Sequence, residues 1–316
     1  MMVIRHTEGR GDMKKTIQTA AMVVVFGVAI STPMQTYAYQ EPTNYVHTKT
    51  DNMIVYSKYG AKISATEKDG KFSVKADIVN NRQPLEVEIF KNGHTGVLKQ
   101  VTKKTIEPVV YRDEGDRVIA TIHGNADLKF VHPIVNNFRD IANSSYAMYI
   151  TALAERGIVN GRTPDYFGEN ETLTRAQVSA LVVRAFSLQH ENTTQFKDID
   201  AKKSWYGGYV GALTSLGIMK GKSYDEFNPN GKLTRQQAIL ILGRMLDAVD
   251  FTPDEEFDAF PYSDSENFDD ELYQHTSKLY ALGAIDFEEI LEPTQRITRG
   301  QFAKMLYKVL QGSGRL

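Results

Sequence analysis

The stretch Leu173-Thr174-Arg175-Ala176-Gln177 recurs in related form as Leu233-Thr234-Arg235-Gln236-Gln237 and as Ile297-Thr298-Arg299-Gly300-Gln301. The three copies begin about 60 residues apart, and each precedes an apolar run. Regular recurrence of this kind indicates one supersecondary unit used three times, whose copies must stack to complete a core.

A threonine followed three residues later by a glutamine is typical of a capping box at a helix start. The six capping residues are Thr174, Gln177, Thr234, Gln237, Thr298 and Gln301. After each box, apolar residues recur at i, i+3, i+4 and i+7, as in Val178, Leu181, Val182 and Ala185. The spacing predicts three amphipathic helices, each with one buried stripe.

An arginine stands at the first helical position of every copy: Arg175, Arg235 and Arg299. A cation gains nothing from the dipole at a helix N-terminus, so helix stability does not explain it. One alternative is that each arginine pairs with an acidic side chain of a neighbouring repeat. The other is that free N–H groups and the guanidinium together bind an anion, a carboxylate or phosphate. Three copies in register favour the anion.

The motif resembles the T-R-A-E signature of the S-layer homology domain, by which some bacterial surface proteins attach to the cell wall. Phe138-Arg139-Asp140-Ile141 and Phe196-Lys197-Asp198-Ile199 open the first two repeats, and Tyr262-Ser263-Asp264 stands at the third opening. The resemblance predicts repeats over 138–190, 196–250 and 260–311, the last one degenerate because Phe287 replaces a glycine.

The resemblance implies that the repeats form an all-α, pseudo-threefold bundle. It also implies grooves that hold a secondary cell-wall polysaccharide, whose terminal sugar carries an acidic pyruvate ketal. By motif position, Arg175, Arg235 and Arg299 would contact the ketal or sugar hydroxyls. Asp140 and Asp198 would accept from sugar hydroxyls, Trp205 would stack on a sugar or else pack in the core, and Gly161 and Gly221 would allow close backbone approach.

The chain has 316 residues, a formal net charge of −2, 41% hydrophobic residues and no cysteine. These values predict about two globular domains and exclude disulfides and thiolate metal sites. There is no basic stripe with interleaved aromatics, so nucleic acid is not an expected partner. We expect no cofactor and no metal.

Residues 1–38 are predicted to be a leader and secretory signal peptide. Met13-Lys14-Lys15 supplies a basic end, 20–30 an apolar run, and Thr36-Tyr37-Ala38 a small-residue cleavage site. Met13 is the expected true start. The apolar run is too short to span a bilayer, so no membrane insertion is expected after cleavage.

Residues 39–137 are predicted to form a small β-rich module. Alternating apolar residues indicate strands at 72–78, 85–89 and 118–122, and Asp69-Gly70 and Asn92-Gly93 indicate hairpins. About five to seven strands would build an antiparallel sandwich or barrel. The region has no catalytic motif, and the acidic stretch 113–116 is interpreted as a solvated turn.

A run of acids without lysine or arginine spans 247–271. Calcium binding is one interpretation, since hard cations bind oxygen ligands. The spacing of a D-x-D-x-D-G loop is missing, which favours a solvated connector that lengthens the third repeat.

The predicted fold class is α+β multidomain, with a small all-β module followed by an all-α bundle. We predict a secreted, non-enzymatic protein of the cell wall or S-layer surface, anchored non-covalently through an acidic polysaccharide and displaying the β module. Its expected partners are that polysaccharide and other surface proteins. The alternative is a wall-anchored enzyme, such as a cell-wall hydrolase, with its active site on the β module.

Overall fold

The computed structural model describes residues 46–58, 61–77, 81–103, 105–133, 137–192, 194–200, 203–253, 262–286 and 290–316. They all lie in one compact unit, 42–316. The predicted leader, signal peptide and start at Met13 lie outside the described residues, as do Phe287 and the stretch 254–261.

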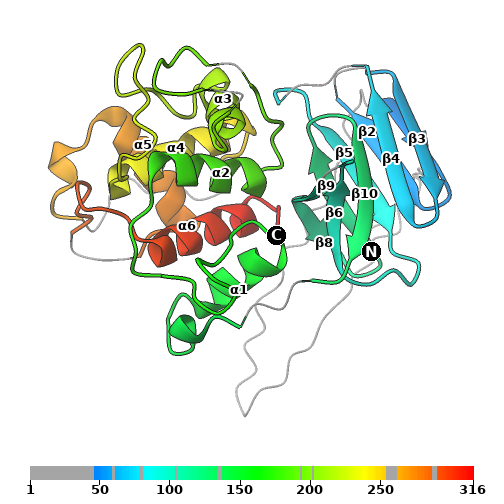
Figure 1. The fold of residues 1–316 in the computed structure, drawn as a ribbon, viewed down its shortest axis with the longest axis horizontal. Coiled ribbons are helices and arrows are strands. Elements are labelled where there is room, and N and C mark those ends of the chain that lie inside the picture. Colours follow the sequence, from blue (N-terminus) through cyan, green and yellow to red (C-terminus); the bar gives the residue numbers. More distant parts are fainter. Residues whose placement is uncertain are drawn as a thin grey trace, which may run out of the picture. The chain divides into compact units, whose positions relative to one another are not determined.

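Two antiparallel sheets form the β region (Figure 1). The first has the order β1 (Val46–Lys49), β2 (Met53–Ser57), β5 (Leu85–Phe90), β9 (Arg117–Ile122), β8 (Tyr111–Asp113). The second has the order β3 (Ile63–Lys68), β4 (Lys71–Ala76), β10 (Ala126–Val131), β6 (Val97–Val101), β7 (Ile106–Pro108).

The alternation that predicted the strands also builds the sandwich core. In β2 and β9 every second residue is buried, so each strand has one face in the core. Val55, Phe72, Val87, Leu98 and Leu128 are buried members of this core, and they come from both sheets.

Strand number and one turn differ from prediction. The described residues contain ten strands rather than five to seven, because β7 and β8 have only 3 residues each and are too short to show a period. Asp69-Gly70 has the positive φ of a hairpin turn and joins β3 to β4 as predicted. Asn92-Gly93 also has positive φ, but it joins β5 to β6 in different sheets, so the predicted hairpin there is wrong.

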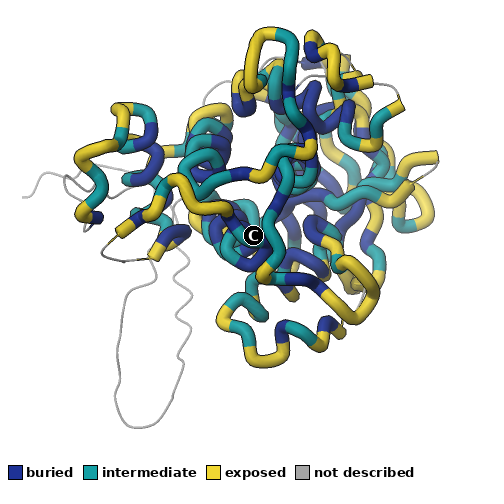
Figure 2. Tube along the Cα trace, turned by 60° about the vertical axis from the view of Figure 1, so that its left-hand side comes forward, coloured by how far each residue is buried: buried dark blue, intermediate teal, exposed yellow. Residues whose placement is uncertain are grey.

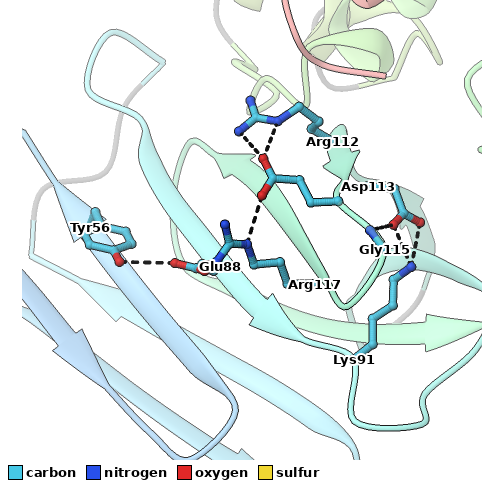
Figure 3. Close-up of polar contacts among 8 residues, drawn as sticks. Tyr56, Glu88, Lys91, Arg112, Asp113, Gly115 and Arg117 are labelled. Carbon is cyan, nitrogen blue, oxygen red and sulfur yellow. Dashed lines mark hydrogen bonds and ion pairs between the residues drawn. The ribbon is translucent and has the colours of Figure 1, made fainter. Parts of the chain in front are cut away.

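The acidic turn 113–116 joins β8 to β9 and is held by charges (Figure 3). Glu114 pairs with Arg112 at 2.8 Å and with Arg117 at 2.9 Å, and Asp113 pairs with Lys91 at 2.6 Å. These contacts lower the pKa of both carboxyl groups, although partial burial opposes the shift. The turn is a paired charge network rather than simply a solvated loop.

The described part of 137–316 contains six α-helices: α1 (Ala147–Glu155), α2 (Arg175–Ala185), α3 (Gly207–Ser215), α4 (Arg235–Ala248), α5 (Asp270–Ala281) and α6 (Arg299–Gly312). Short 3-10 helices span Arg139–Ile141 and Ser265–Asn267. The helices pack as α6 with α1, α2 with α3 and α4 with α5. Each pair joins two different repeat units, which are the segments predicted at 138–190, 196–250 and 260–311. Buried stretches and exposed loops alternate along the chain (Figure 2).

The prediction of an all-α bundle after residue 137 is wrong. The segments before α2, α4 and α6 are extended and form bridges Thr174↔Lys232, Thr234↔Arg296 and Thr172↔Thr298. Leu233 N donates to Leu173 O at 3.1 Å, Ile297 N to Leu233 O at 3.1 Å, and Leu173 N to Ile297 O at 3.4 Å. Buried backbone groups must be paired. Leu173, Leu233 and Ile297 are buried, and the three backbone bonds between them form a closed ring.

Within the described ranges, no helix is long and apolar enough to cross a membrane. Several acids of the 247–271 run have protein partners: Asp247 pairs with Lys278, Glu271 with Arg244, and Asp269 caps α5. Asp254, Glu255, Glu256 and Asp258 of this run lie outside the described residues.

Candidate functional site

Each of the three threonine–glutamine pairs forms a capping box. In α2, Gln177 N donates to Thr174 Oγ1 at 3.2 Å, and Thr174 N donates to Gln177 Oε1 at 2.9 Å. Thr234 with Gln237, and Thr298 with Gln301, make the same two bonds at the starts of α4 and α6. The helix starts are therefore set by local sequence.

The prediction that these helix starts have free N–H groups for an anion is wrong. Arg175 N donates to Gly231 O at 2.9 Å, and the next N–H, of Ala176, donates to Pro229 O at 3.0 Å. The first two N–H groups of α4 bond to Gln295 O and Pro293 O, and those of α6 bond to Glu171 O and Glu169 O. Backbone carbonyls of each repeat unit thus accept from the first N–H groups of the capped helix in the unit before it. Carbonyls of the first unit do the same for the third.

Two of the three arginines are held by carbonyls of the next unit. Arg175 donates from Nε to Phe227 O at 2.8 Å and from Nη2 to Lys220 O at 2.5 Å. Arg299 donates from Nε to Phe167 O at 3.0 Å and from Nη2 to Asn160 O at 2.7 Å. The guanidinium carbons lie 4.3 Å and 4.4 Å from the centres of the Phe227 and Phe167 rings. Neither acid pairing nor an anion is needed to account for these two side chains.

Burial dominates the electrostatics of both groups. It lowers the pKa of Arg299 to about 10 and lowers the pKa of Arg175 also, with Asp198 partly opposing the shift in Arg175. Burying a cation is costly unless it is compensated, and here two guanidinium N–H groups donate to carbonyls while an aromatic ring covers one face of each arginine. A contact of Arg175 or Arg299 with a polysaccharide stays a prediction.

The two predicted sugar-binding aspartates hold turns of their own units. Asp140 accepts from Phe167 N at 2.8 Å and Gly168 N at 2.7 Å, and Asp198 accepts from Phe227 N at 2.9 Å and from the following N–H at 2.7 Å. Asp264 does the same for Leu291 N and its neighbour, each at 3.0 Å. Sequence reasoning had compared Asp264 only with the opening motif, yet its contacts are those of the other two.

The third arginine lies in a different environment. Arg235 lines a narrow groove together with Tyr146, Ile239, Asp286, Gln301 and Lys304. The residue that matches Phe167 and Phe227 by its bond to the unit's aspartate is Leu291, so the aromatic ring that lies under the other two arginines is replaced by an aliphatic side chain. Lys304 forms an ion pair with Asp286 inside this groove.

The groove is small but rich in charge. Its volume of about 40 Å³ exceeds the roughly 30 Å³ that one water occupies in the liquid, which is enough for a carboxylate group rather than a whole sugar. Two cations, one carboxylate and a tyrosine converge there, and Tyr146 was not among the residues singled out from sequence.

The remaining predicted residues divide by exposure. Trp205 is 61% exposed and makes edge contacts with Tyr206 and Tyr209, so it is not a core residue. Gly161 and Gly221 are required by the protein itself: an added Cβ would lie 2.4 Å from the Phe138 ring and 2.3 Å from the Phe196 ring. Their predicted role in ligand approach stays untested.

Comparison with known proteins finds the S-layer homology domain family at residues 137–179 and 195–239. The chain is 30% identical over 164 residues to the surface-layer 125 kDa protein of Lysinibacillus sphaericus, which covers 50% of this chain and 13% of the relative. It is 29% identical over 112 residues to an S-layer protein of Bacillus licheniformis, and this match covers 34% of this chain and 13% of that relative. An amylopullulanase of Thermoanaerobacterium thermosulfurigenes is 27% identical over 182 residues, and this match covers 57% of this chain and 10% of that relative.

Two segments of the chain therefore match the repeats of the S-layer homology domain family. The matches support a cell-wall or S-layer location and cell-surface anchoring of a secreted protein. The chain spans only 10% to 13% of the length of these relatives. The third repeat predicted at 260–311 is not matched by the family.

Proposed function

We propose that the chain is a non-enzymatic anchor whose helical region binds an acidic, pyruvylated secondary cell-wall polysaccharide and so displays the β module. Residues 260–311 act as the third repeat, because Asp264, the Thr298 capping box and Arg299 make the same kinds of contact as their counterparts. The observation that carries the proposal is the Arg235–Lys304–Tyr146 groove, which has room for one anionic group.

Arg235 is the main ketal contact in this proposal, with Lys304 beside it. The grooves are shaped chiefly by Arg175, Arg299, Asp140 and Asp198. The exposed parts of these side chains contact sugar hydroxyls. Trp205 is the stacking face, since its ring is exposed. Gly161 and Gly221 have no side chain and so allow the polymer to approach the backbone closely.

Co-sedimentation of the full chain with purified walls tests the anchor. A charge-assisted contact contributes about 1.5–3 kcal/mol, so Arg235→Ala should weaken binding by about tenfold or more. Arg139→Ala is the matched control, because the Arg139 side chain is 86% exposed and outside the groove. Wild-type binding should fall on walls stripped of the ketal and at high salt.

The result that contradicts the assignment is a folded Arg235→Ala protein that pellets like wild type, with folding checked by circular dichroism. Release of soluble sugar or peptide from walls incubated with the protein would contradict the non-enzymatic part and return the hydrolase alternative.

A further inference from the structure

A second hollow lies beside α3 and shares no lining residue with the Arg235 groove. Its volume is about 720 Å³, within the range of roughly 300–1,000 Å³ that small-ligand sites occupy. Its polar lining consists mainly of hydroxyl, amide and carboxylate side chains: Glu191, Thr194, Gln195, Thr214, Ser215 and Ser223.

Several of these groups have their donor hydrogens bonded within the protein. Thr214 donates to Val210 O at 2.9 Å, Ser215 donates to Ala212 O at 3.1 Å, and Ser223 donates to Asp225 Oδ1 at 3.1 Å. A hydroxyl has one hydrogen and two lone pairs, so the oxygens of Thr214 and Ser215 are left as acceptors, whereas Ser223 Oγ already accepts from Glu226 N at 3.2 Å and has one lone pair left.

Gln195 and Glu191 have the same polarity. Gln195 donates one Nε2 hydrogen to Tyr224 O at 2.8 Å and keeps its amide oxygen as an acceptor, and an ionised glutamate can only accept. The hollow therefore offers mostly acceptors, and the chemistry that complements it is a ligand with many O–H donors.

Two further features suit a sugar chain. Tyr224 follows Ser223 directly and is 83% exposed, which leaves an aromatic face for the C–H side of a sugar ring. Gly217 has φ +75° and nothing within 4 Å of the place where a Cβ would stand, so backbone is open to the ligand there. Lys220 supplies one cationic donor in the lining.

We propose that this hollow is a subsite for a neutral, polyhydroxylated glycan segment, whose hydroxyls donate to the oxygens of Thr214, Ser215 and Glu191 while one ring stacks on Tyr224. The inference deepens the proposed anchor, because it adds a neutral-sugar site to the acidic-sugar groove. The glycan has two sources with the same chemistry, the neutral part of the secondary polysaccharide and the glycan strand of peptidoglycan.

Isothermal titration of the full chain distinguishes the sources. The probes are purified secondary polysaccharide fragments, the same fragments after removal of the ketal, and N-acetylglucosamine oligomers. Thr214→Val removes the acceptor with little change of shape, and Tyr224→Ala removes the stacking face. Tyr166→Ala is the control, since Tyr166 is an exposed aromatic of the first unit.

Loss of one hydrogen bond in Thr214→Val should weaken binding of a neutral probe by about threefold to tenfold, and loss of the stacking face in Tyr224→Ala should have an effect of similar size. Tyr166→Ala should bind like wild type, and Arg235→Ala should weaken only the ketal-bearing fragments. Binding of either neutral probe that depends on Thr214 and Tyr224 supports the subsite and identifies its source. If neither neutral probe binds, or both variants bind like wild type, the subsite is wrong, while the Arg235 arm still reports separately on the anchor.

Discussion

Replacing Arg299 with alanine should destabilise the helical region by removing a contact between its two ends. The side chain joins the start of α6 to Phe167 and Asn160 of the first unit, more than 130 positions earlier in the chain. Arg299 is only 9% exposed, so water does not readily replace the lost bonds. The change therefore opens the ring of units at one joint.

The magnitude follows from three contributions. Two hydrogen bonds from a charged donor contribute about 1.5–3 kcal/mol each, and a cation over an aromatic ring adds about 0.5–2 kcal/mol. Burial lowers the pKa of Arg299 from 12.5 to about 10, and at about 1.4 kcal/mol per pKa unit the desolvation of the cation offsets about 3.5 kcal/mol. Mid-range values leave about 2 kcal/mol of net stabilisation, which corresponds to a fall in Tm of about 4–8 °C.

Differential scanning calorimetry of the full chain is the assay, with Arg139→Ala as the control that should change stability by less than about 0.5 kcal/mol. Arg299→Lys is the second variant: it keeps the charge but cannot donate to both carbonyls in the fork geometry, so it should recover less than half of the loss. A Tm for Arg299→Ala equal to that of the control would refute the reasoning and leave Arg299 available for a ligand.

Three further changes test other contacts. Asp140→Ala should destabilise the protein by about 2–3 kcal/mol in urea titration, because two backbone N–H groups lose a charged acceptor; an unchanged midpoint would contradict this. Gly243→Ala should cost about 1 kcal/mol, since the new Cβ would lie 2.3 Å from His275 Cγ, and the loss should vanish in a His275→Ala background if that contact is the cause. Burial lowers the pKa of His123 from 6.5 to about 4, so the unfolded state binds the proton more readily. The free energy of unfolding should therefore fall by about 3 kcal/mol as pH drops from above 6.5 to below 4. His123→Gln should show a smaller fall over that range, and an equal fall would exclude this histidine as the cause.

The parts of the fold that sequence predicts are those in which both partners are close in the chain. Thr174 and Gln177 are three residues apart, and their types alone specify the capping box that forms. The alternation in β9 is equally local, and this strand, predicted at 118–122, buries every second residue. The short strands β7 and β8 also pair with strands close in the chain, but with 3 residues each they are too short to show a period.

The role of Arg175 could not be predicted for a different reason. Its partners are the backbone carbonyls of Phe227 and Lys220, and every residue has a carbonyl, so no residue type marks them. Sequence reasoning considered acidic side chains and anions, the partners that leave a trace in composition. The available signal for stacking was an aromatic residue before two of the three capping boxes, Phe167 and Phe227.

The same motif position then has two uses in one domain. Where the next unit supplies phenylalanine, as at Phe167 and Phe227, the arginine is stacked, bonded to carbonyls and largely withdrawn from solvent. Where the next unit supplies Leu291, the arginine instead lines a groove beside Lys304. A ring of backbone bonds joins all three units. The arginine of the proposed anion site is thus the one whose neighbouring unit departs most from the motif.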